Sequence, residues 1–271
     1  MSDSSPPWVT DPDLSGATLE DLNIDDSLPQ LERVSLYVQS KIPLQRLVHT
    51  KLLSSTAIAA GFDVANSTLL PLLMPLAADP AVVVRQSLPE QIAAMAPFFV
   101  ECGGVEGYNA FLEGLLVPLS RLVCDEREEV RQAASEALAQ CASWIKPPDV
   151  GRHLLTVVLR LAHDDDDDGR RVTAAWLLSE LSAVLGSDLS HQFLIPELVS
   201  LAQDPKVRVR RHVAWVMRRI FSSLGGPQRL LDEYLGLTED DSYRVRRACT
   251  EVSFCLTLST LLPDFDSSSE I

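Results

Sequence analysis

A run of five aspartates, Asp164–Asp168, directly follows His163 in the sequence. Several carboxylate oxygens in one short loop are what a hard cation such as Ca²⁺ or Mg²⁺ requires. The run does not show the combined pattern of a glycine at the sixth place and a glutamate at the twelfth place that defines an EF-hand loop. We therefore interpret it as a solvated acidic turn, with a cation site as the alternative.

The remaining histidines and cysteines form no pattern that is typical of catalysis or of metal binding. The sequence contains no CxxC pair, no P-loop, no GxGxxG and no nucleophile elbow. The five cysteines are scattered and odd in number, which favours a reducing cytosolic or nuclear compartment. We interpret Cys124, next to Asp125, as a packed thiol. The sequence predicts no catalytic residue, no cofactor and no metal.

A third kind of polar pattern recurs along the chain: an aspartate six residues before an arginine. A single pair could bind an anion, but an in-phase series indicates a structural repeat. A degenerate copy, Ser40/Arg46, comes first, and the arginines at 46, 85, 131, 171, 210 and 246 lie 36 to 46 residues apart. We interpret the pairs as a ladder that joins stacked repeats, in which the aspartates also accept backbone N–H groups. The five full pairs are Asp79/Arg85, Asp125/Arg131, Asp165/Arg171, Asp204/Arg210 and Asp240/Arg246.

Apolar segments of helical period flank each of these pairs. Counted from the arginine, the places +3, +7 and +10 are mostly apolar, as in Ala134, Leu138 and Cys141. No such helix pair can bury its apolar face alone, so the pairs must stack. The sequence predicts an all-α fold, an α-solenoid of about six HEAT-type helix pairs. We expect the pairs at 30–61, 66–101, 106–145, 148–186, 189–224 and 227–262.

Charge and composition set the limits of this repeat region. Residues 1–27 contain seven acidic residues and no lysine or arginine, and residues 264–271 contain three further acidic residues. We therefore expect a disordered acidic leader at 1–27, a solenoid at 28–262 and a disordered tail at 263–271. No apolar run reaches the roughly 18 residues of a transmembrane helix, and the first residues do not resemble a signal peptide.

The last expected helix, CTEVSFCLTLSTLLP, is apolar on nearly all sides. A terminal repeat normally has a polar outer face. We therefore expect that further repeats followed it, or that this end pairs with another chain.

One place in the repeat changes character in two neighbouring copies. The place +5 after the arginine is charged in four copies, at Lys51, Glu90, Glu136 and Glu251, which predicts that it is exposed. In the other two copies a tryptophan occupies it. Tryptophan and arginine together are typical of protein-binding hot spots. Alternatively, the indoles seal the gap between adjacent helices, or they stack on nucleic-acid bases. The predicted partner-binding residues are Trp176, Arg211, Trp215, Arg218 and Arg247, with Phe254 on the same arc.

The segment 206–247 holds ten lysines and arginines against five acidic residues, so a local basic patch stands out in a chain of net charge −15. Because part of this charge belongs to turns and to the ladder, we expect an acidic protein partner, or the chain's own acidic leader, rather than nucleic acid.

The spacing of proline, aspartate and arginine resembles HEAT repeats. Pro71–Asp79–Arg85 and Pro196–Asp204–Arg210 match that family's pattern, while the third and fifth copies lack the proline. The order AIAAGFDVANSTLLPLL, VVVRQSLPEQIAAMAPFF and CDEREEVRQAASEAL is similar to the regulatory and scaffold subunits of protein phosphatases 4 and 2A. The likeness covers about 28–262, although those subunits are longer arrays.

The resemblance implies a non-catalytic subunit in the cytoplasm or nucleus that binds a phosphatase catalytic subunit or other regulatory subunits. It implies partner binding on the concave face and the turns, with no membrane, nucleic acid or small molecule involved. A second interpretation is a karyopherin-like transport or assembly adaptor that binds peptides or proteins. A third is a HEAT-fold enzyme such as a bilin lyase or a di-iron hydroxylase.

Overall fold

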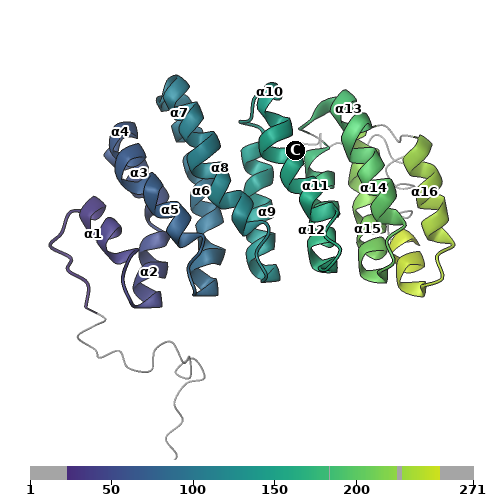
Figure 1. Cartoon of the computed structure of the whole chain (residues 1–271), viewed down its shortest axis with the longest axis horizontal. Helices are drawn as coiled ribbons and strands as arrows, with labels where there is room; N and C mark the ends of the chain where they lie inside the picture. Colours follow the sequence, from purple (N-terminus) through teal and green to yellow (C-terminus); the bar gives the residue numbers. More distant parts are fainter. Residues whose placement is uncertain (1–22, 183, 225–227, 251–271) are drawn as a thin grey trace, which may run out of the picture. The chain divides into compact units, whose positions relative to one another are not determined.

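The computed structural model describes residues 23–182, 184–224 and 228–250. Every regular element in these ranges is a helix, and the chain divides into two compact units, Met1–Ile145 and Lys146–Ile271. Figure 1 shows that consecutive helices within each unit pack as neighbours. The prediction of an all-α solenoid of HEAT-type helix pairs is confirmed.

The first unit contains three helical repeats. In the first repeat the first helix is unbroken and the second is divided into two, α2 and α3. In the other two repeats a first helix broken by a π turn is followed by a continuous second helix, and these second helices, α6 and α9, pack against each other. The predicted pairs 30–61, 66–101 and 106–145 therefore match within a few residues. The elements are α1 (Gln30–Tyr37), α2 (Pro43–Thr50), α3 (Leu53–Ala60), α4 (Phe62–Val64), η2 (Ala65–Leu69), α5 (Leu70–Leu76), α6 (Val82–Cys102), α7 (Gly104–Ala110), η3 (Phe111–Leu115), α8 (Leu116–Leu122) and α9 (Glu128–Ala142).

The second unit continues the same alternation, and its second helices α12 and α15 pack together. The predicted pairs 148–186 and 189–224 match the structure closely. Residues 243–250 are helical, whereas most of the expected last helix, from residue 251 on, lies outside the described residues. The elements are α10 (Pro147–Val150), η4 (Gly151–Leu155), α11 (Thr156–Ala162), α12 (Asp168–Leu181), α13 (Gly186–Leu189), η5 (Ser190–Leu194), α14 (Ile195–Ala202), α15 (Val207–Leu224) and α16 (Gln228–Thr238).

A π-helical turn interrupts the first helix of four repeats, at η2, η3, η4 and η5. Such a turn holds extra residues and locally breaks the 3.6-residue period. One of these turns also allows close packing, because a Cβ at Gly114 would come within 2.4 Å of the Leu70 side chain. The apolar period of the first helices predicts their helical character but not these turns.

The helical period of apolar residues marks the buried face correctly. In α9, Ala134, Leu138 and Cys141 are at most 1 % exposed. In α15, the corresponding residues Val213 and Met217 are fully buried. The core of each unit is therefore formed by one face of every second helix and the first helices beside it.

Buried ion pairs connect successive repeats within each unit. In every pair the arginine of one repeat binds the aspartate of the next repeat through Nε and Nη2. The paired side chains are only 5 to 17 % exposed. We call this series the Asp–Arg ladder. Its Nε–Oδ2 distances are 2.6 Å for Arg46–Asp79, 2.7 Å for Arg85–Asp125, 2.6 Å for Arg171–Asp204 and 2.7 Å for Arg210–Asp240.

The third guanidinium nitrogen of each ladder arginine binds the turn that precedes its own helix. Arg210 Nη1 donates to the carbonyl oxygens of Asp204 and Pro205 at 2.8 and 3.3 Å. Arg131 and Arg246 make the same two bonds to the turns before their helices. Each arginine thus fixes a turn as well as joining two repeats.

The ladder aspartates also organise their own turns. Asp204 Oδ1 accepts a hydrogen bond from the backbone N–H of Lys206 at 2.7 Å, and Asp79 does the same for Ala81 at 2.8 Å. In the first repeat, Ser40 Oγ accepts the corresponding bond from Ile42 N–H at 3.1 Å. A serine can therefore accept this turn hydrogen bond in place of the aspartate, but it does not carry the negative charge of the aspartate.

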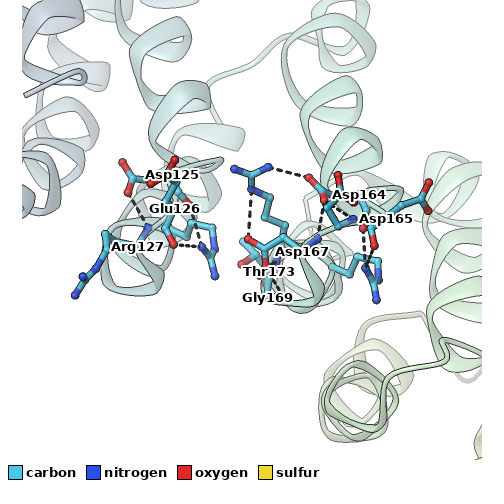
Figure 2. A network of polar contacts seen from close by, with 12 residues as sticks. Asp125, Glu126, Arg127, Asp164, Asp165, Asp167, Gly169 and Thr173 are labelled. Atoms are coloured by element: carbon cyan, nitrogen blue, oxygen red, sulfur yellow. Dashed lines mark hydrogen bonds and ion pairs between the residues drawn. The ribbon is translucent and has the colours of Figure 1, made fainter.

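The third aspartate is shifted by one residue from the predicted position. Asp164, and not Asp165, accepts the turn hydrogen bonds, from the N–H groups of Asp166 and Asp167 at 3.2 and 2.9 Å (Figure 2). Arg171 Nη1 accordingly donates to the Asp164 carbonyl at 2.7 Å. The turn is one residue longer than its counterparts, so counting six residues back from the arginine assigned the wrong aspartate.

Ordered contacts begin before the predicted start of the repeat region at residue 28. The N–H of Asp25 donates to Tyr37 Oη at 2.7 Å, and Asp26 forms an exposed ion pair with Arg33 at 3.0 Å. The rest of the predicted leader, 1–22, and the predicted tail, 263–271, lie outside the described residues.

We expect Asp204→Asn to lower the free energy of unfolding of the second unit by about 3 kcal/mol, because it leaves the buried Arg171 without a counter-charge. The asparagine oxygen can still accept the bond from Lys206 N–H, so the turn is kept. Urea denaturation followed by circular dichroism measures the change. Glu233→Gln, which alters only an exposed bond to Gln203, is the control and should cost less than about 0.5 kcal/mol. Equal losses would contradict a structural role for the ladder.

Stability should also fall in acid. Hydrogen bonds from Arg210 hold the pKa of Asp240 below its ordinary value. At Asp125, burial acts to raise the pKa of the carboxyl group. The hydrogen bonds from the Arg85 side chain and from the Arg127 backbone outweigh burial, so this pKa is also below its ordinary value. Because folding lowers these pKa values, the unfolded chain takes up protons first, and stability present at neutral pH is lost below about pH 4. Melting temperatures measured from pH 7 to pH 3 test this, and a flat profile would contradict it.

Candidate protein-binding groove

A groove of about 550 Å³ opens in the second unit, between α15 and the helical residues 243–250. The described residues that line it are mostly cationic or aromatic, and none of them is a carboxylate. We call it the Arg–Trp groove. Its lining residues are Arg211, His212, Trp215, Tyr243, Arg244, Arg247 and Ala248.

Helical spacing places an arginine and an aromatic residue on each wall. On α15, Arg211 and Trp215 are four residues apart, and on the opposite wall Tyr243 and Arg247 have the same separation. Residues four apart lie on one face of a helix, about one turn from each other. Each wall therefore presents one ring and one guanidinium towards the same space.

The two aromatic side chains are exposed to an unusual degree for their size. Trp215 is 56 % exposed and Tyr243 is 63 % exposed. The His212 ring lies 5.6 Å from the Trp215 ring and is tilted by 43°, which supports one side of the indole. An exposed indole with one side held in place is suited to cover an apolar group of a partner.

The groove is positively charged. Arg211, Arg244 and Arg247 are all exposed, and arginine stays protonated at any physiological pH. Neither Arg211 nor Arg244 forms an ion pair with the residues that the structure describes. The nearby ladder carboxylate of Asp240 is bound by Arg210 at 2.7 and 3.0 Å, so it is already engaged.

The structure brings together three of the five predicted binding residues: Arg211, Trp215 and Arg247. Trp176 is half-buried on α12 and does not line the groove. Arg218 lies in α15, but its side chain is outside the described part of the chain, and so is Phe254.

Two residues of the groove, Tyr243 and Arg244, are not among the predicted binding residues. They precede the ladder residue Arg246 in the segment SYRVRR, ahead of the places counted from that arginine. The helix in fact starts at residue 243, which carries both side chains onto the groove wall. The usable signal was an aromatic residue four places before Arg247.

The place +5 is exposed where the residue is charged, as the repeat pattern predicted. Lys51, Glu90 and Glu136 are exposed at this place, and Trp215 shares their exposure. Glu251 lies outside the described residues. Trp215 is thus as exposed as the charged residues at this place, whereas Trp176, at the same place in its own repeat, is half-buried.

The aspartate run forms a capped turn. Asp167 accepts hydrogen bonds from the N–H groups of Gly169 and Arg170 at the start of α12, at 2.8 and 3.3 Å. Asp164 binds the Arg170 side chain at 2.9 Å, and this bond lowers the pKa of Asp164 (Figure 2). In the described ranges, no group of three or more His, Cys, Asp or Glu side chains is arranged to hold a metal ion.

The cysteines that are buried are poorly ionised. Burial raises the pKa of the Cys141 thiol to about 12 and, with the charge of Asp240 as a second cause, that of Cys249 to about 11. Thiols with such pKa values are weak nucleophiles at neutral pH. Cys124 is half-buried, and Cys255 lies outside the described residues.

None of the helices in the described ranges is both long enough and apolar enough to span a lipid bilayer.

No family model matches the chain. Among solved structures, it is similar to Cex1p, with a TM-score of 0.58 and 14% sequence identity over 88% of this chain and 45% of that one. Two designed armadillo repeat proteins also match. One, solved in complex with the peptide (KR)4, has a TM-score of 0.46 and 21% identity over 83% of this chain and 99% of its own. The other, designed for modular peptide recognition, has a TM-score of 0.43 and 19% identity over 83% and 98%. The likeness to Cex1p supports the helical repeat fold.

We expect Trp215→Ala to change the free energy of unfolding by less than about 1 kcal/mol, because the exposed indole contributes little to the core. Met217→Ala, two residues away on the fully buried face, should cost about 2–5 kcal/mol. Urea denaturation of both variants tests the contrast. A large loss for Trp215→Ala would mean that the indole seals the repeat and does not serve as a binding surface.

Proposed function

We propose that this chain is a non-catalytic scaffold that binds another protein through the Arg–Trp groove. The observation that carries this proposal is the exposure of Trp215 beside three arginines on a wall of packed helices. Tryptophan, tyrosine and arginine dominate the binding energy of protein interfaces. A preorganised surface also loses little conformational entropy on binding, and the buried ladder holds the turns at the base of these helices.

We further propose that its partner complex is a phosphatase of the protein phosphatase 4/2A type, in the cytoplasm or nucleus. The support comes from the sequence resemblance over about 28–262 and from the Pro196–Asp204–Arg210 spacing. In this role the chain would bind a catalytic subunit, or another regulatory subunit, and would fix its position relative to the substrates of the phosphatase. The catalytic metals would belong to the partner.

Affinity purification of the tagged full-length chain, followed by mass spectrometry, tests both parts. We expect a phosphatase catalytic subunit to be recovered, and Trp215→Ala to reduce the recovery about tenfold. Glu136→Ala is the matched control, because it changes the same exposed place in another repeat. It should leave the recovery unchanged.

The two parts of the proposal can fail separately. Recovery of a small GTPase or of import cargo, without a phosphatase, would replace the phosphatase assignment with a transport adaptor. Recovery of a phosphatase that is insensitive to Trp215→Ala would retain that assignment and move its binding site away from the groove.

A further inference from the structure

We propose that residues 13–22 of this chain fold back onto an exposed apolar face at the start of the first unit and cover it. The face is formed by Leu44 and Val48 of α2 and by Val83 of α6, and we call it the N-terminal apolar face. The inference concerns the chain's own N-terminal segment, so it goes beyond the proposed scaffold function and does not depend on the binding partner.

The three side chains of this face are largely open to solvent. Leu44, Val48 and Val83 are 50, 42 and 49 % exposed. Leu44 and Val48 are four residues apart in α2 and therefore share one side of that helix. Helices α2 and α6 pack against each other, so Val83 extends the same patch onto the neighbouring repeat.

The repeat register places Leu44 level with Val83, because each lies two residues before the ladder arginine of its helix. In three later repeats an exposed charged residue occupies this place. These residues are Glu129, Arg208 and Arg244. The first two repeats therefore present apolar side chains where solvent is normally met by charge.

Val48 is exposed because its repeat is the first that the structure describes. Its place, two residues after the ladder arginine, lies about 200° around the helix from that arginine. Since the arginine reaches to the next repeat, this place faces the preceding one. In the repeats that follow another repeat it is half-buried or buried, at Ser87, Ala133, Thr173, His212 and Ala248. An apolar side chain here needs a cover, as terminal repeats of solenoids generally do.

The chain enters the described region beside this face. Gln45, which directly follows Leu44, donates from Nε2 to the carbonyl oxygen of Asn23 at 3.4 Å. The eight residues of α2 extend about 12 Å, whereas ten residues can span roughly 35 Å. The ten residues before Asn23 can therefore reach the whole face.

The composition of residues 13–22, DLSGATLEDL, matches the face and its surroundings. The segment contains three leucines and three acidic residues, and no basic residue. Lys41 lies three residues before Leu44 and Lys51 three residues after Val48, and both lysines are exposed. Neither of them forms an ion pair with the residues that the structure describes. The leucines can thus bury the apolar patch while the carboxylates lie near the two ammonium groups.

The covalent link favours this segment over a separate molecule. A segment joined to the face by a short linker has a local concentration in the millimolar range. A second copy of the chain, at micromolar concentration, would have to bind much more tightly to displace it.

Carbodiimide coupling of the full-length chain, followed by mass spectrometry, tests the proposal, because it joins only carboxylates and amines that are in contact. We expect Lys51 to be coupled to Glu20 or Asp21 within the monomer. The double variant Leu44→Ser/Val48→Ser should lower the yield about tenfold. Val105→Ser is the control, since this valine is 80 % exposed in the same unit outside the face, and it should leave the yield unchanged.

Hydrogen exchange of the same full-length proteins gives an independent measurement. The amides of residues 13–22 should exchange at least about tenfold more slowly than in an unprotected chain, and the double variant should remove this protection. Unprotected amides, no Lys51 cross-link, or a yield that the double variant does not change would overturn the proposal.

Two further outcomes would replace the occupant or the site. Cross-links found only in covalent dimers would make a second copy of the chain the cover of the face. Cross-links to Lys206 as abundant as those to Lys51 would move the segment to the second unit. Neither measurement needs a phosphatase, so their results are independent of the purification experiment.

Discussion

The buried Arg–Asp pair between successive repeats is the interaction on which each unit depends. A single arginine uses Nε and Nη2 for the carboxylate of the next repeat and Nη1 for the turn before its own helix, as Arg210 does with Asp240 and Asp204. The apolar faces of the helices supply most of the driving force for packing, but they are not directional. The ladder interactions are directional, because a buried guanidinium keeps all of its hydrogen-bond partners in only one alignment of the two repeats.

The groove is a consequence of this register. Arg211 and Arg247 each directly follow a ladder arginine, Arg210 and Arg246. Since the ladder fixes the rotation of each second helix about its axis, the residues one place later must turn away from the core. The same bonds that join the repeats thus place two charged side chains of neighbouring helices in one cavity, and Trp215 lies one turn further along.

The sequence was sufficient for the helix pairs because their signals are periodic: the apolar places of Ala134 and Leu138 and the spacing of the arginines recur. It was insufficient where the period is locally broken. The π turns and the extra residue before Arg171 change the count without changing the residue types. At the groove, Trp215 was identifiable because a tryptophan replaces a charged residue at a repeated place. Tyr243 was not, because its position depends on where a helix starts.

The displaced aspartate at Asp164 shows how much variation a turn of this kind can absorb. The aspartate that organises the turn and the carbonyls that hold Arg171 have both moved back by one position, and the helix that follows begins normally at Asp168. Insertions at such junctions lengthen a chain without disturbing the surfaces on either side. A repeat of this kind can therefore vary in length at its turn while the helix that follows keeps its starting point relative to the ladder arginine.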